Sequence, residues 1–326
     1  MKHISILVPK GAILGSLEGT RQLFTQVNQF MKAKGAPPLF KVQLVGLTEA
    51  TPLCGGAFTA HANVLIDDVK KTDLIIIPAV DGEIKNAIEI NRDFIPWITK
   101  QYKNGAEVAS LCMGAFILAS TGLLKGKKCA THWMSANQFR TMFPDVNLVT
   151  EQIITDEQGL YSSGGAFSYM NLILYLIEKY AGREIAILSS KVFAIEIDRH
   201  SQSPFIMFQG QKEHGDEPIK HAQEFIENNF MEKITVDELA SRLALGRRNL
   251  ERRFKKATSN TVVEYIQCVK IEAAKKSFET TRKNINEIMY DVGYSDTKAF
   301  RTVFKRITGL SPVEYKSRYN KEALYA

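Results

Sequence analysis

The chain has 326 residues, enough for two domains with sizeable cores, and its 45% hydrophobic and 24% charged content excludes a disordered or fibrous protein. The net charge is only +7, so composition alone does not indicate a polyanionic partner. The four cysteines show no CxxC pair and no metal-like spacing with histidine: Cys54, Cys112, Cys129 and Cys268. We therefore expect no disulfide framework, no bound metal and no cofactor.

The N-terminus begins with an apolar run, 4–8, that Lys10 interrupts, so it predicts a buried strand and no signal peptide. No apolar run approaches the roughly 18 residues that a membrane span requires. We expect a cytoplasmic protein that does not contact a membrane.

The first two hundred residues alternate between strand-like and helix-like patterns. Strands are predicted at 3–8, 41–47, 73–78 and 107–111, and helices at 17–31, 87–104, 113–120 and 167–180. This alternation predicts an α/β domain with a mostly parallel sheet covered by helices on both faces.

A cysteine stands between the predicted strand 107–111 and the helix that follows it. A strand, a tight turn at Cys112 and a helix form the pattern of a nucleophile elbow, and Gly114 permits close backbone approach. The helix N-terminus there favours a thiolate, and His132 is a candidate imidazole partner. The alternative is that Cys112 is a small buried residue and His132 a hydrogen-bonded one.

Residues 1–195 resemble the DJ-1/PfpI superfamily of class I glutamine-amidotransferase-like domains, which implies a flavodoxin-like fold. The elbow carries the resemblance, with support from the run 73–78 and from Gly164-Gly165 before a helix. The enzymes of that superfamily keep a Glu near the first strand and a Gly-Gly pair after the third-strand proline. This chain has Ser16 at the aligned position, with Glu18 the nearest acid, and Ala79-Val80 after Pro78.

These departures predict a ligand pocket on an altered catalytic frame and not an enzyme. The pocket is expected beyond the carboxyl ends of the strands, from Ser16, Val80, Cys112, Met113 and His132. Related sensor domains fused to AraC-type domains in GlxA-like regulators bind small nitrogenous metabolites. The resemblance therefore implies a small-molecule effector of that kind, and nothing in the sequence selects one.

Residues 199–217 are polar and punctuated by Gly and Pro, so they predict a connection between a domain at 1–198 and another at 218–326. Beyond it, every segment has helical periodicity. Residues 211–326 hold 22 Lys and Arg against 17 Asp and Glu, whereas residues 1–210 hold 20 against 18. The densest basic run is 247–256.

The C-terminal region repeats itself. At an offset of 50, Phe254-Lys255 aligns with Phe304-Lys305, Thr258 with Thr308, and 263–265 with 313–315. Each copy predicts a helix-turn-helix, with helices at 236–244 and 247–257 in the first and at 285–292 and 296–307 in the second. Helix starts are predicted at Thr235, Thr261 and Ser311, each with Glu three residues later. Gly293 is expected in a left-handed conformation, and Asp296 is expected to cap the next helix.

The second copy resembles the signature of AraC-family DNA-binding domains, and the resemblance covers residues 220–320. The matching residues are Gly293, Tyr294, Asp296, Phe300, Phe304, Lys305, Thr308, Gly309, Ser311, Pro312 and Tyr315. It implies an all-α double helix-turn-helix whose second helices enter successive major grooves about 10 bp apart.

The residues implied to face DNA are Arg247, Arg248, Asn249, Glu251 and Arg252 in the first copy, and Thr297, Lys298, Arg301, Thr302 and Lys305 in the second. Apolar positions such as Leu250 and Phe300 are interpreted as core. Ser259 stands where the first copy usually has Gly, and Thr302 where the second often has Arg. We therefore expect the first copy to read more bases and the second to rely more on phosphates.

The leading hypothesis is a transcription regulator, expected to be an activator, that binds double-stranded DNA under control of the effector. A homodimer formed through the N-terminal domain and contact with RNA polymerase are implied partners. One alternative is a cysteine hydrolase or glyoxalase-like enzyme with a DNA-tethering tail. Another is a constitutive DNA-binding protein with an inert dimerisation domain.

Overall fold

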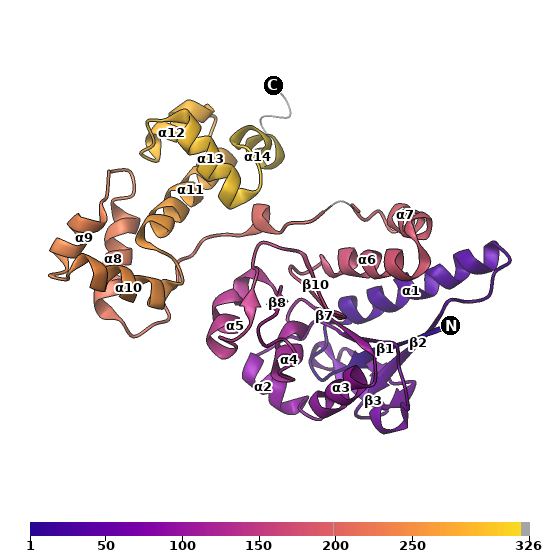
Figure 1. Cartoon of the computed structure of the whole chain (residues 1–326). Helices are drawn as coiled ribbons and strands as arrows, with labels where there is room; N and C mark the ends of the chain where they lie inside the picture. Colours follow the sequence, from indigo (N-terminus) through magenta and orange to yellow (C-terminus); the bar gives the residue numbers. More distant parts are fainter. Residues whose placement is uncertain (198, 321–326) are drawn as a thin grey trace. The chain divides into compact units, whose positions relative to one another are not determined.

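The computed structural model describes residues 1–197 and 199–320, which form two compact units (Figure 1). The first unit ends at Gln202 and the second begins at Ser203, so the division falls inside the segment 199–217. None of the helices in the described residues is long and apolar enough to cross a membrane.

The first unit is built on a seven-stranded sheet in the order β10-β11-β7-β6-β1-β2-β5. The strands are β1 (Lys2–Val8), β2 (Phe40–Gly46), β5 (Val64–Leu65), β6 (Leu74–Ile77), β7 (Glu107–Leu111), β10 (Ile154–Glu157) and β11 (Leu160–Ser163). Every pair is parallel except β10 with β11, which form an antiparallel edge. The predicted mostly parallel sheet is confirmed.

Alternate strand residues face two helical layers, as the two-residue period of a strand requires. Ile6 and Ile76 pack with α1 (Leu14–Ala33), α6 (Tyr169–Ala181) and α7 (Arg183–Val192). Leu7 and Ile75 pack on the other face, with α2 (Ile84–Ile90), α3 (Phe94–Lys103), α4 (Gly114–Ser120) and α5 (Ala136–Met142). The strands bury apolar side chains on both faces, which explains why they read as continuous apolar runs in the sequence.

The prediction of one helix at 87–104 is wrong, because this segment forms two helices. α2 ends at Ile90 and α3 begins at Phe94. The fully buried Asn91 causes the break: its amide donates to the carbonyl of Lys10 at 2.9 Å and accepts from the Lys10 amide at 2.8 Å. Pro96, which has no N–H to donate, suits the first turn of the new helix.

Several short elements were not predicted from the sequence. These are the sheet strands β5, β10 and β11, the hairpin β3 (Ala50–Leu53) with β4 (Phe58–His61), the pair β8 (Lys128–Cys129) and β9 (Asn147–Leu148), and helices α5 and α7. The four predicted strands form the centre of the sheet as β1, β2, β6 and β7.

The second unit contains only helices in its described residues, as expected. They are α8 (Glu217–Asn228), α9 (Val236–Arg242), α10 (Arg247–Thr258), α11 (Val262–Thr280), α12 (Ile285–Asp291), α13 (Thr297–Thr308) and α14 (Pro312–Tyr319), with a short 3-10 turn η4 at Ser203–Phe205. Two separate cores form, one around Leu250 and Phe254 and the other around Phe300 and Phe304. The long helix α11 contributes to both.

Candidate nucleic-acid interface and elbow site

The first helix-turn-helix consists of α9 and α10. Thr235 caps α9 by accepting the amide of Glu238 at 3.2 Å, although the returning carboxylate bond of a full capping box does not form among the described residues. The turn closes where the amide of Leu245 reaches the carbonyl of Ala240 at 2.9 Å. This places Ala244 in the left-handed region, with φ of 50°. The turn therefore adopts the geometry that usually requires Gly.

The second helix-turn-helix consists of α12 and α13. Asn284 and Glu287 form a full capping box at the start of α12, which was not predicted because Asn stands in the place of the usual Ser or Thr. Gly293 ends α12 with φ of 73°, and Asp296 caps α13 by accepting the amide of Ala299 at 2.6 Å. Both predictions for this turn are confirmed.

The sequence repeat is also a structural repeat. Thr258 and Thr308 each donate to the carbonyl four residues earlier, at 2.8 and 2.9 Å, and each closes the following turn in the same way. Phe254 stacks edge-on against Tyr265 at 5.3 Å, and Phe304 against Tyr315 at 5.5 Å. Full capping boxes start the next helix in both copies. The two units share one local framework.

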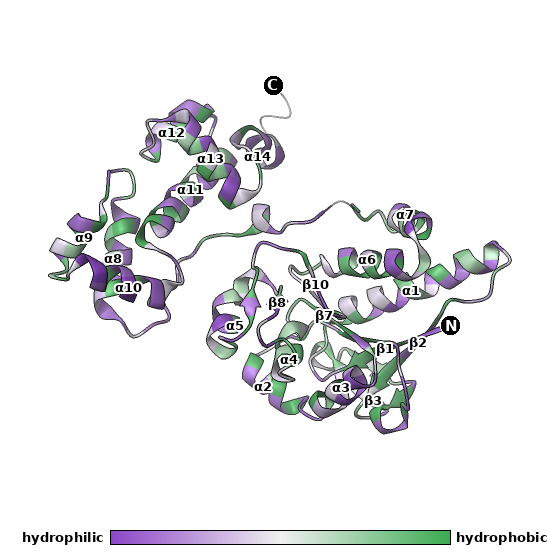
Figure 2. Cartoon of the chain, viewed as in Figure 1, coloured by the Kyte–Doolittle hydropathy of each residue, from purple (hydrophilic) through white to green (hydrophobic). Residues whose placement is uncertain are grey.

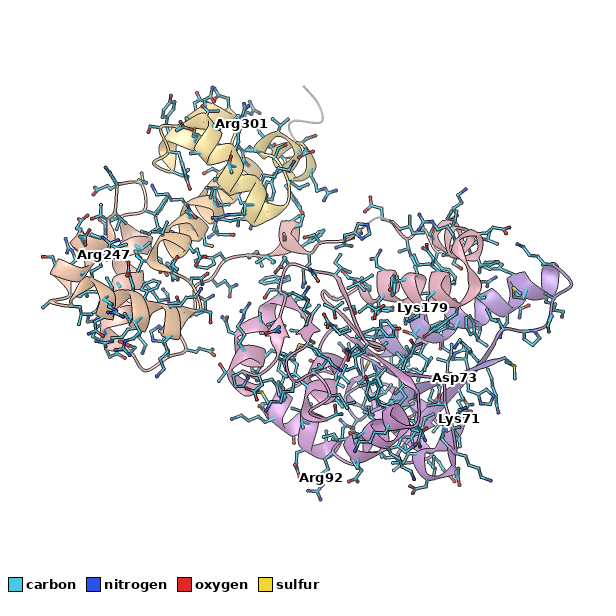
Figure 3. All side chains as sticks on the ribbon, in the orientation of Figure 1. Lys71, Asp73, Arg92, Lys179, Arg247 and Arg301 are labelled. Atoms are coloured by element: carbon cyan, nitrogen blue, oxygen red, sulfur yellow. The ribbon has the colours of Figure 1, made fainter. Side chains whose placement is uncertain are left out.

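The residues predicted to face DNA lie on the solvent side of α10 and α13. All are exposed except Thr297, which is half-buried: Arg247, Arg248, Asn249, Glu251, Arg252, Lys298, Arg301, Thr302 and Lys305. The hydropathy colouring shows α10 as hydrophilic over most of its length (Figure 2). Figure 3 labels Arg247 and Arg301, which belong to the first and the second helix-turn-helix of the helical unit. The residues interpreted as core, Leu250, Phe254, Phe300 and Phe304, are fully buried.

Some cations of α10 already have partners within the protein. Arg247 pairs with Asp237 at 2.9 Å and with Glu251 at 3.3 Å, and Arg252 donates to Asn249 at 3.0 Å. Exposed pairs of this kind contribute little to stability. They hold these side chains over the exposed face of the helix.

The elbow in the first unit has the expected backbone. Cys112 has φ of 52°, and its amide donates to the carbonyl of Ser163 at 2.9 Å. A Cβ on Gly114 would lie 2.5 Å from the carbonyl oxygen of Pro78, so the close approach predicted there is confirmed. The strained residue sits where β7 turns into α4.

Burial opposes a thiolate at this elbow. Cys112 is only 4% exposed, and burial raises the pKa of its thiol to about 11. The short helix α4 cannot offset that desolvation. His132 is not a hydrogen-bond partner of Cys112 in the described residues: it starts the turn Trp133–Ser135, and its Nδ1 accepts the amide of Met134 at 3.2 Å. Burial also lowers the pKa of the His132 imidazole.

Ser16 occupies the place that the resemblance gives to a catalytic carboxylate. Its hydroxyl accepts the amide of Ala79 at 3.1 Å and donates to the carbonyl of Ile13 at 2.8 Å. Val80 is buried and pairs with Ala12 in an isolated bridge. The backbone amide of Ala79, the first residue after Pro78, is therefore engaged within the protein.

The five predicted pocket residues gather at the carboxyl ends of β1, β6 and β7, with Ser16, Val80 and Cys112 buried and Met113 and His132 half-buried. Three cavities of the described residues lie elsewhere. One of about 590 Å³ lies at the amino ends of the strands, beside His3 and Asp73. Two of about 450 and 430 Å³ belong to the helical unit, beside Phe208 and beside Arg301.

A residue that the sequence analysis missed lies against the elbow. Gln202 is 1% exposed, and its amide donates to the carbonyls of Thr131 at 3.0 Å and Thr150 at 2.7 Å. Thr131 in turn donates to the carbonyl of Cys112 at 3.0 Å. The side-chain oxygen of Gln202 is buried with no hydrogen-bond partner in the described residues. The contact between Gln202 and Thr131 could not be predicted because the two residues are 71 positions apart in the sequence.

The chain after Gln202 is fixed to the helical unit at once. Pro204 accepts from the Tyr319 hydroxyl at 3.4 Å, and the turn η4 packs on α13. Lys275 donates to the carbonyl of Ile206 at 2.6 Å, and the amide of Phe208 donates to Glu272 at 3.0 Å. We call residues 203–208 the strap. It contacts helices of the second copy and the shared helix α11.

The family comparisons agree with both units. Residues 28–179 match the DJ-1/PfpI family, and residues 239–318 match a helix-turn-helix domain. The chain therefore combines a DJ-1/PfpI domain with an AraC-type helix-turn-helix domain, which is the architecture of its AraC-family relatives.

Two relatives from Pseudomonas aeruginosa share this architecture. The chain is 28% identical over 251 residues to the HTH-type transcriptional regulator GbdR, covering 72% of the chain and 65% of GbdR. It is 22% identical over 309 residues to the HTH-type transcriptional regulator CdhR, covering 94% of the chain and 89% of CdhR. The chain thus spans about two thirds of GbdR and most of CdhR.

The fold of the first unit also occurs in a crystal structure of an AraC family transcriptional regulator from Pseudomonas putida. The TM-score is 0.50 at 14% identity, over 59% of this chain and 100% of that one. At this identity the likeness concerns the fold alone.

Proposed function

We propose that the protein is a sequence-specific DNA-binding transcription regulator, and an activator, whose helices α10 and α13 read DNA. The repeated framework carries the proposal, because both copies expose the polar face of their second helix while burying matched aromatic residues. Arg on such a face suits guanine, and Lys suits phosphate. We also propose that it acts on DNA as a homodimer and contacts RNA polymerase. It would do so in the cytoplasm.

We further propose that the first unit binds an effector at the elbow and does not catalyse a reaction. Three features support this reading over a cysteine enzyme: the burial of Cys112, which raises the pKa of its thiol, the engaged amide of Ala79 and the separate role of His132. Nitrogenous metabolites are the class that we favour for the effector. The unpartnered oxygen of Gln202 is an acceptor that an N–H group could satisfy.

Gln202 offers a physical route for control. Its side chain is held against the elbow, and the next residues of the chain are held on α11 and α13. A ligand that displaces the Gln202 amide from Thr131 would free Gln202 to move, and the strap that follows it could then shift. The helical unit would then respond without any direct ligand contact.

Capture of genomic DNA fragments by the purified full-length protein tests the DNA-binding proposal. We expect a small set of enriched fragments with two protected half-sites on one face of the duplex. Enrichment that follows only total length, with no shared sequence, would show that the protein is not a specific regulator. Genes beside the captured sites would supply candidate effectors.

The alternatives separate by two measurements. Purified wild-type protein should turn over none of the metabolites that it binds, whereas turnover that is lost in Cys112→Ala would support the enzyme reading. Both tryptophans, Trp97 and Trp133, lie in the first unit, so their fluorescence reports its unfolding. Stabilisation of that unit by a candidate metabolite would exclude an inert dimerisation domain.

A further inference from the structure

A buried lysine lies at the junction between the two helix-turn-helix units. Lys270 of α11 is only 7% exposed. Its ammonium donates to the carbonyl of Gly293 at 3.1 Å and to the carbonyl of Glu232 at 3.4 Å, and it lies 5.5 Å from the ring centre of Tyr294. Glu232 belongs to the α8–α9 loop beside the first helix-turn-helix, and Gly293 ends α12 of the second helix-turn-helix. One cation therefore bonds to the backbone beside both helix-turn-helix copies.

The two loops also touch directly. A Cβ on Gly293 would overlap the carbonyl oxygen of Met231 and would lie 2.6 Å from the ammonium of Lys270. The backbone of Gly293 therefore lies within contact distance of the α8–α9 loop. Carbonyl groups from both loops surround the ammonium, and a buried charge requires such partners.

This junction lies where α11 passes from one core to the other. Tyr265 and Ile266 belong to the first core, whereas Ile271 and Phe278 belong to the second. Each unit has its own aromatic centre, so each can keep its fold if the junction loosens. A single helix with no lateral support would then be free to bend between them.

We propose that Lys270 is a positioning residue that fixes the separation and direction of α10 relative to α13, and so sets the half-site spacing that the protein accepts. This inference rests on the proposed function, because spacing has meaning only if both helices read one duplex. The ammonium acts as a brace between two loops and does not touch DNA. Removing it should cost binding to correctly spaced half-sites and should relax the requirement for that spacing.

The test uses the full-length protein and a captured fragment, with the distance between its two half-sites altered in steps up to about half a helical turn (roughly 5 bp). We compare Lys270→Met with Lys276→Met, which removes the same charge from an exposed position of the same helix. Wild type and Lys276→Met should lose affinity about tenfold or more when the half-sites move out of phase.

Lys270→Met should bind the natural spacing about tenfold more weakly and should lose most of the dependence on spacing. Its affinity for an isolated half-site should stay within about twofold of wild type. Wild-type dependence on spacing in Lys270→Met would overturn the inference. If wild type captures no specific DNA at all, the proposed function itself fails, which is a different result.

Two further variants keep the test decisive if Lys270→Met folds poorly. Lys270→Arg retains a cation that can donate to both carbonyls, so it should restore much of the spacing dependence. Gly293→Ala leaves Lys270 intact but forces the loops apart, so it should relax spacing as Lys270→Met does. If Gly293→Ala binds DNA with wild-type spacing, the loop contact does not position the helices.

Discussion

The two helix-turn-helix units share a framework but differ where the backbone turns. Gly293 and Gly309 occupy the two left-handed positions of the second helix-turn-helix copy, with φ of 73° and 74°. Ala244 and Ser259 occupy the matching positions of the first copy, with φ of 50° and 59°. A side chain in that region costs about 1–2 kcal/mol, so the first copy folds into the same shape with strain that the second copy avoids.

The units also differ in how their recognition helices are charged and held. α10 is dense in Arg and Lys, and ion pairs tie Arg247 to Asp237 and Arg253 to Asp216. Within residues 199–320, no ion pair involves Lys298 or Arg301 of α13. The second helix-turn-helix copy has the less strained backbone, whereas the first copy carries more positive charge on a more strained backbone. Similar sequences thus fold into one shape but differ in strain and in charge.

The largest effects should come from the aromatic centres, which keep the two cores separate. Phe304→Ala should destabilise the second helix-turn-helix copy by about 3–5 kcal/mol, because it leaves a cavity beside Phe278 and Tyr315. Hydrogen-exchange mass spectrometry should show lost protection in α12–α14 and largely retained protection in α8–α10. Phe254→Ala should give the reverse pattern. Equal loss in both units would show that they fold as one core.

The unequal charge of the recognition helices predicts different failures on DNA. Arg252→Ala should weaken specific binding by about 1–3 kcal/mol and relax the preference at one base position, as expected for a base contact. Lys298→Ala should weaken all sequences nearly equally and should reduce the slope of log K against log salt by about 1, as expected for a phosphate contact.

Binding measured against a set of single-base variants at several salt concentrations separates these outcomes. If Lys298→Ala changes base preference while Arg252→Ala does not, the roles of the two helices are reversed. If neither variant alters binding, the assignment of recognition helices is wrong.

Features that depend on neighbouring residues could be predicted from the sequence, and features that depend on distant contacts could not. The alternating strands, the repeat and the elbow at Cys112 are local patterns, and the structure contains all three. The break at Asn91 depends on a hydrogen bond to Lys10, 81 residues earlier. Gln202 reaches Thr131 across 71 residues. Burial of Cys112, which reverses the expected thiolate, is also a tertiary property.

Strain at the first left-handed position can be relieved to sharpen the comparison. Ser259→Gly should stabilise the first helix-turn-helix copy by about 0.5–1 kcal/mol, and Gly309→Ser should destabilise the second copy by a similar amount. The serine hydroxyl makes no hydrogen bond within the described residues, and the bond from Lys255 reaches the backbone carbonyl, which Gly retains. Exchange protection of α10 and α13 measures both. A destabilised Ser259→Gly protein would show that the turn is not strained.

The smallest effect concerns the pH dependence of stability and should also be confined to the first helix-turn-helix copy and helix α8. Arg253 holds the Asp216 carboxylate with bonds of 2.9 and 2.5 Å and lowers its pKa, whereas Val303 stands at the matching position of the second unit. A lowered pKa stabilises the fold above the unfolded value of about 3.9, and this contribution is lost as the pH falls through the folded value.

Arg253→Gln should therefore reduce the protection of α8 and α10 at neutral pH only slightly, because the pair is partly exposed. It should also reduce the additional loss of protection on acidification below about pH 4. Arg252→Gln removes a neighbouring cation that has no carboxylate partner in the described residues, so it serves as the control. The same acid sensitivity in α12 and α13 would mean that Asp216 is not its source.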